Sequence, residues 1–560
     1  MNDQIKTKYQ AWMNDPIVND IEKIELSSLK EADIVDRFGS ELEFGTAGIR
    51  GVMGVGTNRM NKYVVRKTTQ GLANYLKKTV KNPCVAIAYD SRNNSEVFAK
   101  EAAAVFATNE IPVYIFSELA PVPLLSYAVR KLSCAAGIVI TASHNPKQYN
   151  GYKVYNADGC QLNIEDANKV YEEINKLDIF KDVKITSFVE SLMNGFVAYV
   201  PNIVIESYYK SVCSQSLIGN ATPKSLKIAY SPLNGSGLKP VTSVLKMDGF
   251  NDIHIVEEQK LPNGNFTTCP YPNPETKEAM ELGTKLMLEN NDDILMATDP
   301  DADRVGVVVN HNGEAISLTG NEIGILLFDF IVHVRKQTQS LPNNAVVIKT
   351  IVSSDLVKLI AYKNNVNVID VLTGFKFIGE QIKLLENKRE QNRFLLGFEE
   401  SCGYLTNTNV RDKDGINAVL LIAEMAHYYK TKNRTLIDRL NEIYLEYGDY
   451  KTLTLSYEFS GEEGKQKINS LMSAFRDPEI QKTLGNVEYI GDYKLQKIIK
   501  NGKETSTNLP SSDVIKIFLS NFETVTIRPS GTEPKIKAYI FAKGNLRVKE
   551  LKEKIDGLMK

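Results

Sequence analysis

The stretch VAIAYDS, residues 85–91, is a short apolar run that ends in small polar residues. Helix-length segments and further apolar runs alternate after it, over 96–108, 113–116, 124–131 and 137–141. Buried strands that alternate with helices are typical of βαβ units, which bring parallel strands into one sheet. The sequence therefore predicts an α/β domain with a largely parallel sheet around this stretch.

The junction of strand, polar turn and helix recurs downstream at 228–235 and 347–354. Any α/β protein repeats this pattern, so the recurrence by itself leaves open whether the domains are related. From residue 446 the pattern changes to a helical stretch over 463–475, several strand-like runs and a closing helix over 546–559. We expect three tandem, similar α/β domains over 1–205, 206–318 and 319–445 and a smaller α+β domain over 446–560, around a central cleft.

Composition excludes several classes of function. The 67 basic and 68 acidic residues leave a net charge of −1, which favours neither a nucleic-acid backbone nor an anionic membrane as partner. The six cysteines lack C-x-x-C spacing, which argues against a zinc site or a disulfide framework. The start of the chain shows no signal-peptide pattern and no 18-residue apolar run occurs. We expect a cytoplasmic protein with a small-molecule substrate and no obligate protein partner.

The segment TASHNP, residues 141–146, offers a candidate nucleophile. Ser143 follows the strand-like run 135–140 and precedes Asn145-Pro146, which predicts a tight loop at the carboxyl end of a strand, where α/β sheets bind ligands. His144 and Lys153 lie nearby in sequence, and an exposed hydroxyl with cationic neighbours suits phosphoryl transfer. A purely structural turn is the alternative, and adjacency of Ser143 and His144 does not indicate a Ser-His-Asp triad.

The segment DPDADR, residues 299–304, predicts a cation site. Asp299, Asp301 and Asp303 alternate between two strand-like runs, and three converging carboxylates favour a hard cation such as Mg²⁺. An EF-hand loop is excluded because Arg304 stands where its glycine is required and Asn310 where its glutamate is required. A solvated acidic turn is the alternative, although like charges at this spacing repel one another.

Three further loops carry groups suited to sugars and phosphates. In RPSGT, residues 528–532, the guanidinium of Arg528, two hydroxyls and backbone N–H groups suit a phosphate dianion, while a plain hairpin turn is the alternative. Residues 373–376 and 397–403 place polar side chains beside glycines, and the pair Glu399 and Ser401 suits sugar hydroxyls. Spacing alone does not separate that role from an ordinary acidic turn.

The motifs FGTAGIRG (44–51), TASHNP, DPDADR, GFEESCG (397–403) and RPSGTEP (528–534) follow one another in the order found in the α-D-phosphohexomutases. Nearly the whole chain resembles this family, which includes phosphoglucomutases and phosphomannomutases. The stretch SHNPKQYNGYKV, residues 143–154, is most similar to the branch with phosphoglucomutases and phosphopentomutases.

The resemblance implies a role for each motif. It makes Ser143 a phosphoserine that ligates Mg²⁺ together with Asp299, Asp301 and Asp303. It places Arg50, His144, Lys153 and Arg304 around the transferring phosphoryl group. It assigns the sugar to Thr373, Lys376, Glu399 and Ser401, and the unreactive phosphate to Arg528, Ser530, Gly531 and Thr532. Cys402-Gly403-Tyr404 stands where some relatives carry a histidine, so Lys413 is preferred over His144 as the proton acceptor.

The resemblance also implies the reaction. A sugar monophosphate, expected to be glucose 1-phosphate or glucose 6-phosphate, would receive the phosphoryl group from the phosphoserine, turn over as glucose 1,6-bisphosphate and return the other group. Mannose, ribose and deoxyribose phosphates remain alternatives, because Glu399 and Ser401 can accept hydroxyls in more than one orientation. A phosphoserine-dependent phosphatase and a catalytically silent phosphosugar-binding protein are competing interpretations. The first does not explain the second phosphate loop, and the second does not explain the retained Ser143 and aspartates.

Overall fold

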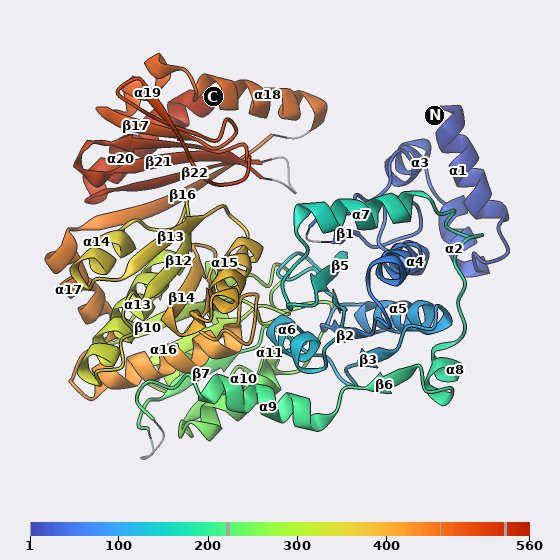
Figure 1. Ribbon diagram of the computed structural model, residues 1–560, viewed down its shortest axis with the longest axis horizontal. Helices are drawn as coiled ribbons and strands as arrows, with labels where there is room; N and C mark the ends of the chain where they lie inside the picture. Colours follow the sequence, from blue (N-terminus) through green and yellow to red (C-terminus); the bar gives the residue numbers. More distant parts are fainter. Residues whose placement is uncertain (1, 47, 220–223, 460, 531–534) are drawn as a thin grey trace. The chain divides into compact units, whose positions relative to one another are not determined.

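The computed structural model describes residues 2–46, 48–219, 224–459, 461–530 and 535–560 (Figure 1). Contacts within the chain divide it into two compact units. Unit 1 comprises Met1–Thr319, Ile378–Phe394 and Ser401–Thr435, and unit 2 comprises Gly320–Phe377, Leu395–Glu400 and Leu436–Lys560.

The first sheet of unit 1 has six strands in the order β1-β5-β4-β2-β3-β6. The strands β4, β2, β3 and β6 are parallel, whereas β5 is antiparallel to both β4 and β1. Every side chain of β2 and β4 is buried, as expected for central strands with helices on both faces. The strands are β1 (Ile49–Val52), β2 (Val85–Tyr89), β3 (Val113–Ile115), β4 (Ala136–Ile140), β5 (Tyr149–Asn156) and β6 (Val197–Tyr199), and the helices are α4 (Lys62–Thr79), α5 (Ser95–Thr108), α6 (Val122–Lys131), α7 (Ile164–Asn175), α8 (Phe188–Met193) and α9 (Asn202–Cys213).

The second sheet repeats the centre of the first. Its order is β11-β10-β9-β7-β8, with β9, β7 and β8 parallel and β10 antiparallel to β9 and β11. The elements are β7 (Ile228–Ser231), α10 (Leu238–Met247), β8 (Ile253–Ile255), α11 (Glu257–Lys260), α12 (Lys277–Glu289), β9 (Ile294–Thr298), β10 (Val305–His311) and β11 (Glu314–Leu318). Unit 1 also contains β15 (Gly403–Leu405) and α16 (Gly415–Lys430). The side chains of α16 are buried along nearly its whole length.

Three short helices precede the first sheet: α1 (Asp3–Asn14), α2 (Asp20–Ser27) and α3 (Glu31–Phe38). A capping box in which Asn19 and Glu22 bond each other's backbone N–H groups starts α2. Trp12 on α1 is 2% exposed, and its ring lies 5.9 Å from that of Phe38, 5.2 Å from that of Tyr63 on α4 and 5.2 Å from that of Phe180. The sequence patterns did not predict this layer, which Figure 1 shows in dark blue beside α4.

The first part of unit 2 is a third α/β region in which β12 lies between β13 and β14 and is parallel to β13. Its elements are α13 (Gly320–Gln337), β12 (Val346–Thr350), α14 (Leu356–Lys363), β13 (Asn367–Val371), the start of α15 (Phe375–Asn387), β14 (Phe394–Glu399) and α17 (Leu436–Tyr447). A 3₁₀ turn, Gln391–Arg393, precedes β14.

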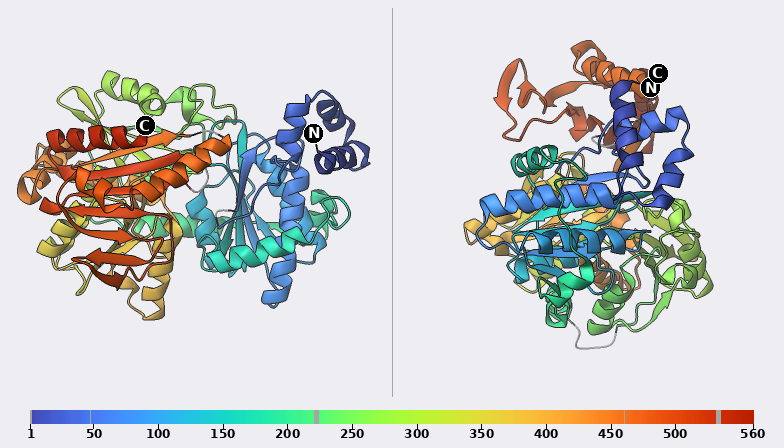
Figure 2. Two further views of the ribbon diagram at one scale, coloured as in Figure 1. Left: turned by 90° about the horizontal axis from the view of Figure 1, so that it is seen from above. Right: turned by 90° about the vertical axis from the view of Figure 1, so that its right-hand side faces the viewer.

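The C-terminal part of unit 2 is built on a seven-stranded antiparallel sheet in the order β16-β22-β21-β20-β17-β18-β19. Helices α18 and α20 pack on it and share one apolar core with its strands (Figure 2). The elements are β16 (Tyr450–Glu458), α18 (Gly461–Ala474), α19 (Pro478–Leu484), β17 (Val487–Asp492), β18 (Lys497–Lys500), β19 (Lys503–Ser506), β20 (Ile515–Leu519), a 3₁₀ turn (Ser520–Phe522), β21 (Thr524–Pro529), β22 (Lys535–Lys543) and α20 (Asn545–Met559).

Unit 2 also contains a group of ion pairs, here called the lysine cluster: Lys349, Lys358 and Lys516 with Asp355 and Asp370. Lys349, Asp355 and Lys516 are buried, and Lys358 and Asp370 are half-buried. Lys349 Nζ lies 2.8 Å from Asp355 Oδ1 and 3.0 Å from Asp370 Oδ1. From β20, Lys516 Nζ donates to Asp355 Oδ2 at 2.6 Å and to the carbonyl of Ile351 at 2.8 Å. The cluster thus joins the C-terminal sheet to the α/β region of the same unit.

The expected fold class, three α/β domains with mixed sheets and a C-terminal α+β domain, is confirmed. Individual elements agree to within one or two residues: the run 85–89 is β2 and the helix expected over 96–108 is α5. None of the helices in the described ranges is long and apolar enough to cross a membrane.

Candidate active site

Ser143 lies in the loop that follows β4, at the carboxyl end of the parallel strands. Its φ is +52°, a left-handed conformation that is uncommon for a residue with a side chain. Its backbone N–H donates to Thr141 Oγ1 at 2.8 Å, and its own hydroxyl donates to Asp299 Oδ2 at 2.7 Å. The loop therefore presents the Ser143 oxygen to the aspartates of the second sheet.

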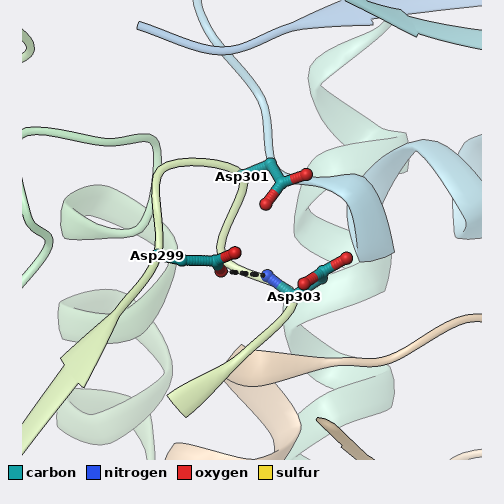
Figure 3. A group of neighbouring side chains, drawn as sticks. All are labelled: Asp299, Asp301 and Asp303. Atoms are coloured by element: carbon teal, nitrogen blue, oxygen red, sulfur yellow. Dashed lines mark hydrogen bonds between the residues drawn. The ribbon is translucent and has the colours of Figure 1, made fainter. Parts of the chain in front are cut away.

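The three aspartates occupy the loop between β9 and β10, and all are at most 1% exposed. Figure 3 shows Asp299, Asp301 and Asp303 around one point, with the Asp303 backbone N–H donating to Asp299 Oδ1 at 3.2 Å. One carboxylate oxygen from each lies within 4.8 Å of the others. Asp301 Oδ1 and Asp303 Oδ1 are buried without a hydrogen-bond partner. Buried oxygens that lack a donor and converge on one point fit a hard cation.

The charges in this cluster oppose one another. Burial raises the pKa of Asp299 well above its ordinary value, and the neighbouring Asp301 and Asp303 raise it further. Burial also raises the pKa of Asp303, again with help from Asp301. Burial alone would raise the pKa of Asp301, but the ammonium of Lys153 holds it below its usual range. A bound cation would relieve this repulsion.

Cationic side chains from several elements reach the same place. On β5, Lys153 Nζ lies 2.8 Å from Asp301 Oδ2 and 3.8 Å from Asp303 Oδ2. Arg304 pairs with Glu275 at 2.9 Å and its Nε lies 3.8 Å from Asp303 Oδ1. These contacts bring Lys153 and Arg304, 151 positions apart by their numbers, to one carboxylate group.

Arg50 and His144 complete the surroundings of the serine loop. Arg50, on β1, donates to Asn145 Oδ1 at 2.8 Å. The turn before β1 needs Gly48, whose φ is +79° and where a Cβ would lie 1.8 Å from the carbonyl oxygen of Tyr152. His144 Nδ1 lies 3.2 Å from Ser143 Oγ. Burial lowers the pKa of His144 well below its usual range, and Arg304 and Arg50 lower it further, so its imidazole is neutral.

Lys413 is 7% exposed and lies between two carboxylates. Its Nζ is 3.2 Å from Asp303 Oδ2 and 3.1 Å from Asp412 Oδ1. Tyr155 and Gln161 donate to the other oxygen of Asp412, at 2.9 and 3.0 Å. The arrangement holds the Lys413 ammonium nitrogen next to the aspartate cluster.

Arg92 was not singled out from the sequence, although it directly follows the stretch 85–91. It is 3% exposed, and it donates to main-chain carbonyls of the loop that carries Ser143. An arginine two residues beyond the aspartate at a strand end is the only sequence signal that points to it. Glu275 and Asp412, the partners of Arg304 and Lys413, were missed as well.

The expected sugar-binding residues lie at the ends of secondary-structure elements: Thr373 just before α15, Lys376 in its first turn, Glu399 at the end of β14 and Ser401 after it. Glu399 ends β14, is 6% exposed and accepts from the Gly374 N–H at 2.8 Å. Thr373 Oγ1 is buried without a hydrogen-bond partner, and Lys376 Nζ lies 4.8 Å from the centre of the Phe377 ring. These three belong to unit 2. Ser401 belongs to unit 1 and is half-buried in the turn after β14.

The expected phosphate-binding loop begins on β21, which continues through Arg528 and Pro529 instead of ending before them. Arg528 lies near Tyr539 and Glu400 and influences the pKa of both side chains. Burial raises these two pKa values, and the positive charge of the Arg528 guanidinium lowers them. The Ser530 N–H donates to the Lys535 carbonyl at 2.8 Å. Gly531 and Thr532 lie outside the described residues.

Comparison with known proteins identifies relatives of the chain. Family models match three parts of the chain: phosphoglucomutase/phosphomannomutase α/β/α domain I at residues 41–180, domain II at 206–313 and domain III at 319–447. A phosphoglucomutase of Staphylococcus aureus (strain bovine RF122 / ET3-1) is 39% identical over 518 residues, which is 91% of each chain. A phosphoglucomutase of Staphylococcus epidermidis (strain ATCC 12228 / FDA PCI 1200) is 39% identical over 503 residues, 89% of this chain and 90% of the relative.

Solved structures share the fold at lower sequence identity. A phosphoglucomutase/phosphomannomutase family protein from Burkholderia thailandensis has a TM-score of 0.68 and 16% identity, covering 92% of this chain and 96% of the other. The open form of the Paramecium phosphoprotein pp63/parafusin also has a TM-score of 0.68 and 16% identity, covering 93% and 95%.

Fold, site and relatives together define the class of the protein: a sugar-phosphate mutase, an isomerase that transfers phosphoryl groups. More specifically, the chain belongs to the phosphoglucomutase/phosphomannomutase family.

Proposed function

We propose that the enzyme interconverts glucose 1-phosphate and glucose 6-phosphate through a phosphoserine at Ser143 and a glucose 1,6-bisphosphate intermediate. The observation that carries the proposal is the 2.7 Å contact between Ser143 Oγ and Asp299 Oδ2, within a carboxylate cluster that has two unpartnered oxygens. A hydroxyl at the edge of a cation site, with Lys153 and Arg304 beside it, is placed to carry a phosphoryl group. Glucose is proposed because the relatives at 39% identity are phosphoglucomutases.

In the proposed reaction, the bond between phosphorus and Ser143 Oγ breaks as a bond forms from phosphorus to a free sugar hydroxyl. The hydroxyl proton leaves to a basic side chain, and Ser143 Oγ takes up a proton as it leaves phosphorus. The bisphosphorylated sugar then reorients, its other phosphoryl group is transferred to Ser143 Oγ, which gives up that proton, and the sugar oxygen that loses the phosphoryl group takes a proton. Arg528 and Ser530, with Gly531 and Thr532, would hold the phosphate that does not react, while Thr373, Lys376, Glu399 and Ser401 would hold the sugar.

We propose Mg²⁺ as the cation of Asp299, Asp301 and Asp303, because an all-oxygen donor set selects hard cations. Bound there, Mg²⁺ supplies positive charge to the phosphoryl oxygens. The chain's own cations, Lys153 and Arg304, act on the same oxygens. Titration calorimetry with Mg²⁺ should show one site in the wild-type protein and none in Asp301→Asn.

Lys413 and His144 are proposed to serve different oxygens. The neutral His144 faces Ser143 Oγ, which fits a role toward the serine. Lys413 lies against Asp303, which fits a role as proton acceptor for the sugar hydroxyl, provided that it gives up a proton first. Arginine keeps the charge but does not accept protons, so Lys413→Arg should lose at least about 100-fold in kcat. Near-wild-type turnover of Lys413→Arg would leave Lys413 with a purely electrostatic role.

The function is tested by following phosphorus NMR of the purified enzyme with glucose 1-phosphate, Mg²⁺ and a trace of glucose 1,6-bisphosphate. Formation of glucose 6-phosphate without inorganic phosphate supports the proposal, whereas stoichiometric release of inorganic phosphate indicates a phosphatase. Mannose, ribose and deoxyribose 1-phosphates are compared in parallel, and a higher kcat/KM for one of them would replace glucose as substrate. We also propose a cytoplasmic setting, in which the six free thiols would stay reduced.

A further inference from the structure

The guanidinium of Arg92 is bound almost entirely by one loop. Its Nη1 donates to the carbonyls of Pro146, at 3.0 Å, and Tyr149, at 3.2 Å. Its Nη2 donates to the carbonyls of Ser143 and Asn145. Four terminal N–H groups thus meet four carbonyls from residues 143–149, a match that the planar fork of arginine provides and the single nitrogen of lysine does not.

Asp90 links this guanidinium to the backbone of Ser143 by a second route. Its Oδ2 lies 3.3 Å from Arg92 Nε and accepts from Thr141 Oγ1 at 2.6 Å. Its Oδ1 accepts from Ser95 Oγ at 2.7 Å and from the Arg92 N–H at 2.9 Å. The Thr141 hydroxyl that donates to Asp90 accepts from the Ser143 N–H, which fixes the direction of that hydroxyl.

These contacts hold a strained residue. A left-handed φ is unfavourable for a residue with a side chain, so Ser143 keeps it only because surrounding contacts impose it. Arg92 fixes the carbonyl of Ser143, and Thr141 fixes its N–H. Both peptide groups of Ser143 are thereby held, and the direction of its side chain follows from them.

The segment between α11 and α12, which belongs to the domain of the second sheet, covers one face of the Arg92 guanidinium. Arg92 Cζ lies 5.0 Å from the centre of the Phe266 ring, which is fully buried. At Gly264 an added Cβ would lie 2.4 Å from the Asn93 nitrogen and 2.9 Å from the Arg92 carbonyl carbon. The same region of the chain that supplies the aspartates therefore also packs against the residue that holds the serine loop.

We propose that Arg92, aligned by Asp90, is a positioning residue for phosphoryl transfer: it holds the Ser143 loop so that Oγ points at the aspartate cluster. The inference rests on the proposed phosphoserine at Ser143. Arg92 binds main-chain carbonyls, so it acts through the direction of Oγ. Misplacing a reacting atom by about 1 Å costs on the order of 100-fold in rate. Losing the hydrogen bonds from Arg92 to the Ser143 loop should therefore lower kcat and leave binding of the sugar unchanged.

The test compares Arg92→Lys with Arg66→Lys. Both replace an arginine of the same sheet region with lysine, but Arg66 pairs with Glu101 at 2.7 Å on helices α4 and α5. Asp90→Asn is the second variant, because it keeps the size and acceptor oxygen of Asp90 while removing the charge that aligns Arg92. For each variant we would measure kcat, KM for glucose 1-phosphate, the unfolding midpoint, and the phosphate on Ser143 by intact mass after incubation with glucose 1,6-bisphosphate.

Arg92→Lys should lower kcat by about 10- to 100-fold with KM changed less than about threefold. The phosphoserine should form more slowly and lose phosphate to water faster, because its oxygens are no longer held against the cluster. Asp90→Asn should give the same pattern with a smaller loss, and Arg66→Lys should behave as wild type in all four measurements.

Two results would overturn the inference: kcat of Arg92→Lys and Asp90→Asn within about twofold of wild type, or losses of activity that only follow the fraction of unfolded protein. If Arg92→Lys does not fold, Asp90→Asn decides on the same criteria. A wild-type protein that never carries phosphate on Ser143 contradicts the proposed function, whereas a phosphorylated wild type with unaffected variants contradicts only the role of Arg92.

Discussion

Two groups of buried charges, one in each unit, differ in how completely they neutralise themselves. In the lysine cluster of unit 2, both oxygens of Asp355 face ammonium groups: Oδ1 faces Lys349 and Lys358 at 2.8 and 2.9 Å, and Oδ2 faces Lys516 at 2.6 Å. Asp355 Oδ1 and Asp370 Oδ1, like Asp301 Oδ1 and Asp303 Oδ1 of the aspartate cluster in unit 1, lack a well-formed hydrogen bond. The two oxygens of the lysine cluster nevertheless lie 2.8 and 3.0 Å from an ammonium nitrogen, whereas Asp303 Oδ1 has its paired cation, Arg304 Nε, at 3.8 Å. The carboxylates of the first cluster are therefore in direct contact with ammonium groups, whereas the second cluster keeps carboxylate oxygens that a bound cation would contact.

The pKa directions report the same difference. Burial would raise the pKa of Asp355, yet Lys349 and Lys516 hold it well below its ordinary value. In the aspartate cluster, burial and like charges raise the pKa values of Asp299 and Asp303, and only Asp301, beside Lys153, has its pKa held low. Buried carboxylates therefore indicate a ligand site when their oxygens lack a cation in contact, whereas carboxylates in contact with buried ammonium groups link elements of the fold.

The sharpest test of the unit 1 site is Ser143→Ala. We expect a loss of at least about 1,000-fold in kcat, because the proposed covalent intermediate has no other acceptor. The unfolding midpoint should stay near that of wild type, since the change removes one hydroxyl. The coupled assay for glucose 6-phosphate and a circular dichroism melt measure both. Retention of more than a tenth of wild-type activity would contradict the assignment.

Asparagine substitutions separate the two clusters by stability. Asp355→Asn should reduce the free energy of unfolding by about 3–5 kcal/mol, because it leaves buried ammonium groups without their counter-charge. Asp299→Asn, measured in EDTA, should leave the free energy unchanged or raise it, because it removes one of three repelling carboxylates. Urea unfolding followed by circular dichroism compares them. Equal losses in both variants would mean that the clusters do not differ as described.

The arginine of the proposed phosphate loop should affect binding more than chemistry at Ser143. Losing a charge-assisted contact removes about 1.5–3 kcal/mol, so Arg528→Ala should raise KM by roughly 10- to 100-fold. Escape of bisphosphate and release of inorganic phosphate per turnover should increase as well, because the intermediate is held less firmly. Unchanged KM, bisphosphate escape and phosphate release together would exclude Arg528 from the phosphate site.

The smallest expected effect is the change of the free energy of unfolding with pH that Lys516 of the lysine cluster causes. Burial lowers the pKa of Lys516 to about 8, although Asp355 opposes the shift. The unfolded chain, in which a lysine has a pKa near 10.4, binds more protons at and above pH 8, so stability rises with pH there. Between pH 8 and 9 the gain should be about 1 kcal/mol. Lys516→Met should lack this increment, and an identical pH slope in both proteins would show that Lys516 does not titrate in that range.

The parts of the site that are predictable from sequence are those whose residues lie close together along the chain. Asp299, Asp301 and Asp303 alternate directly after a buried strand, and Ser143 follows another, so strand ends alone predict their meeting place. Arg92, Glu275 and Asp412 belong to none of the motifs that carry the prediction, and only tertiary contacts show what they hold. The same reason hides the lysine cluster, whose five members come from β12, β13, α14, its N-cap and β20.

The fold, too, could be predicted from the sequence only in part. Uniformly apolar strands such as β2 and the alanine-rich α5 are readable from local pattern, whereas α1, α2 and α3 are short and polar and depend on docking to α4. Arg528 was expected in a loop but extends β21, because its neighbour strand β22 continues the ladder to Pro529 opposite Ile536.

The docking of α1 gives the protein a built-in optical label. The chain has one tryptophan, Trp12, and its indole is enclosed by Phe38, Tyr63 and Phe180. Intrinsic tryptophan fluorescence will therefore report when the N-terminal helices separate from α4, and it will be silent about unit 2. A fluorescence melt that precedes the dichroism melt would measure the release of that layer alone, and the effect of Asp355→Asn would be invisible to it.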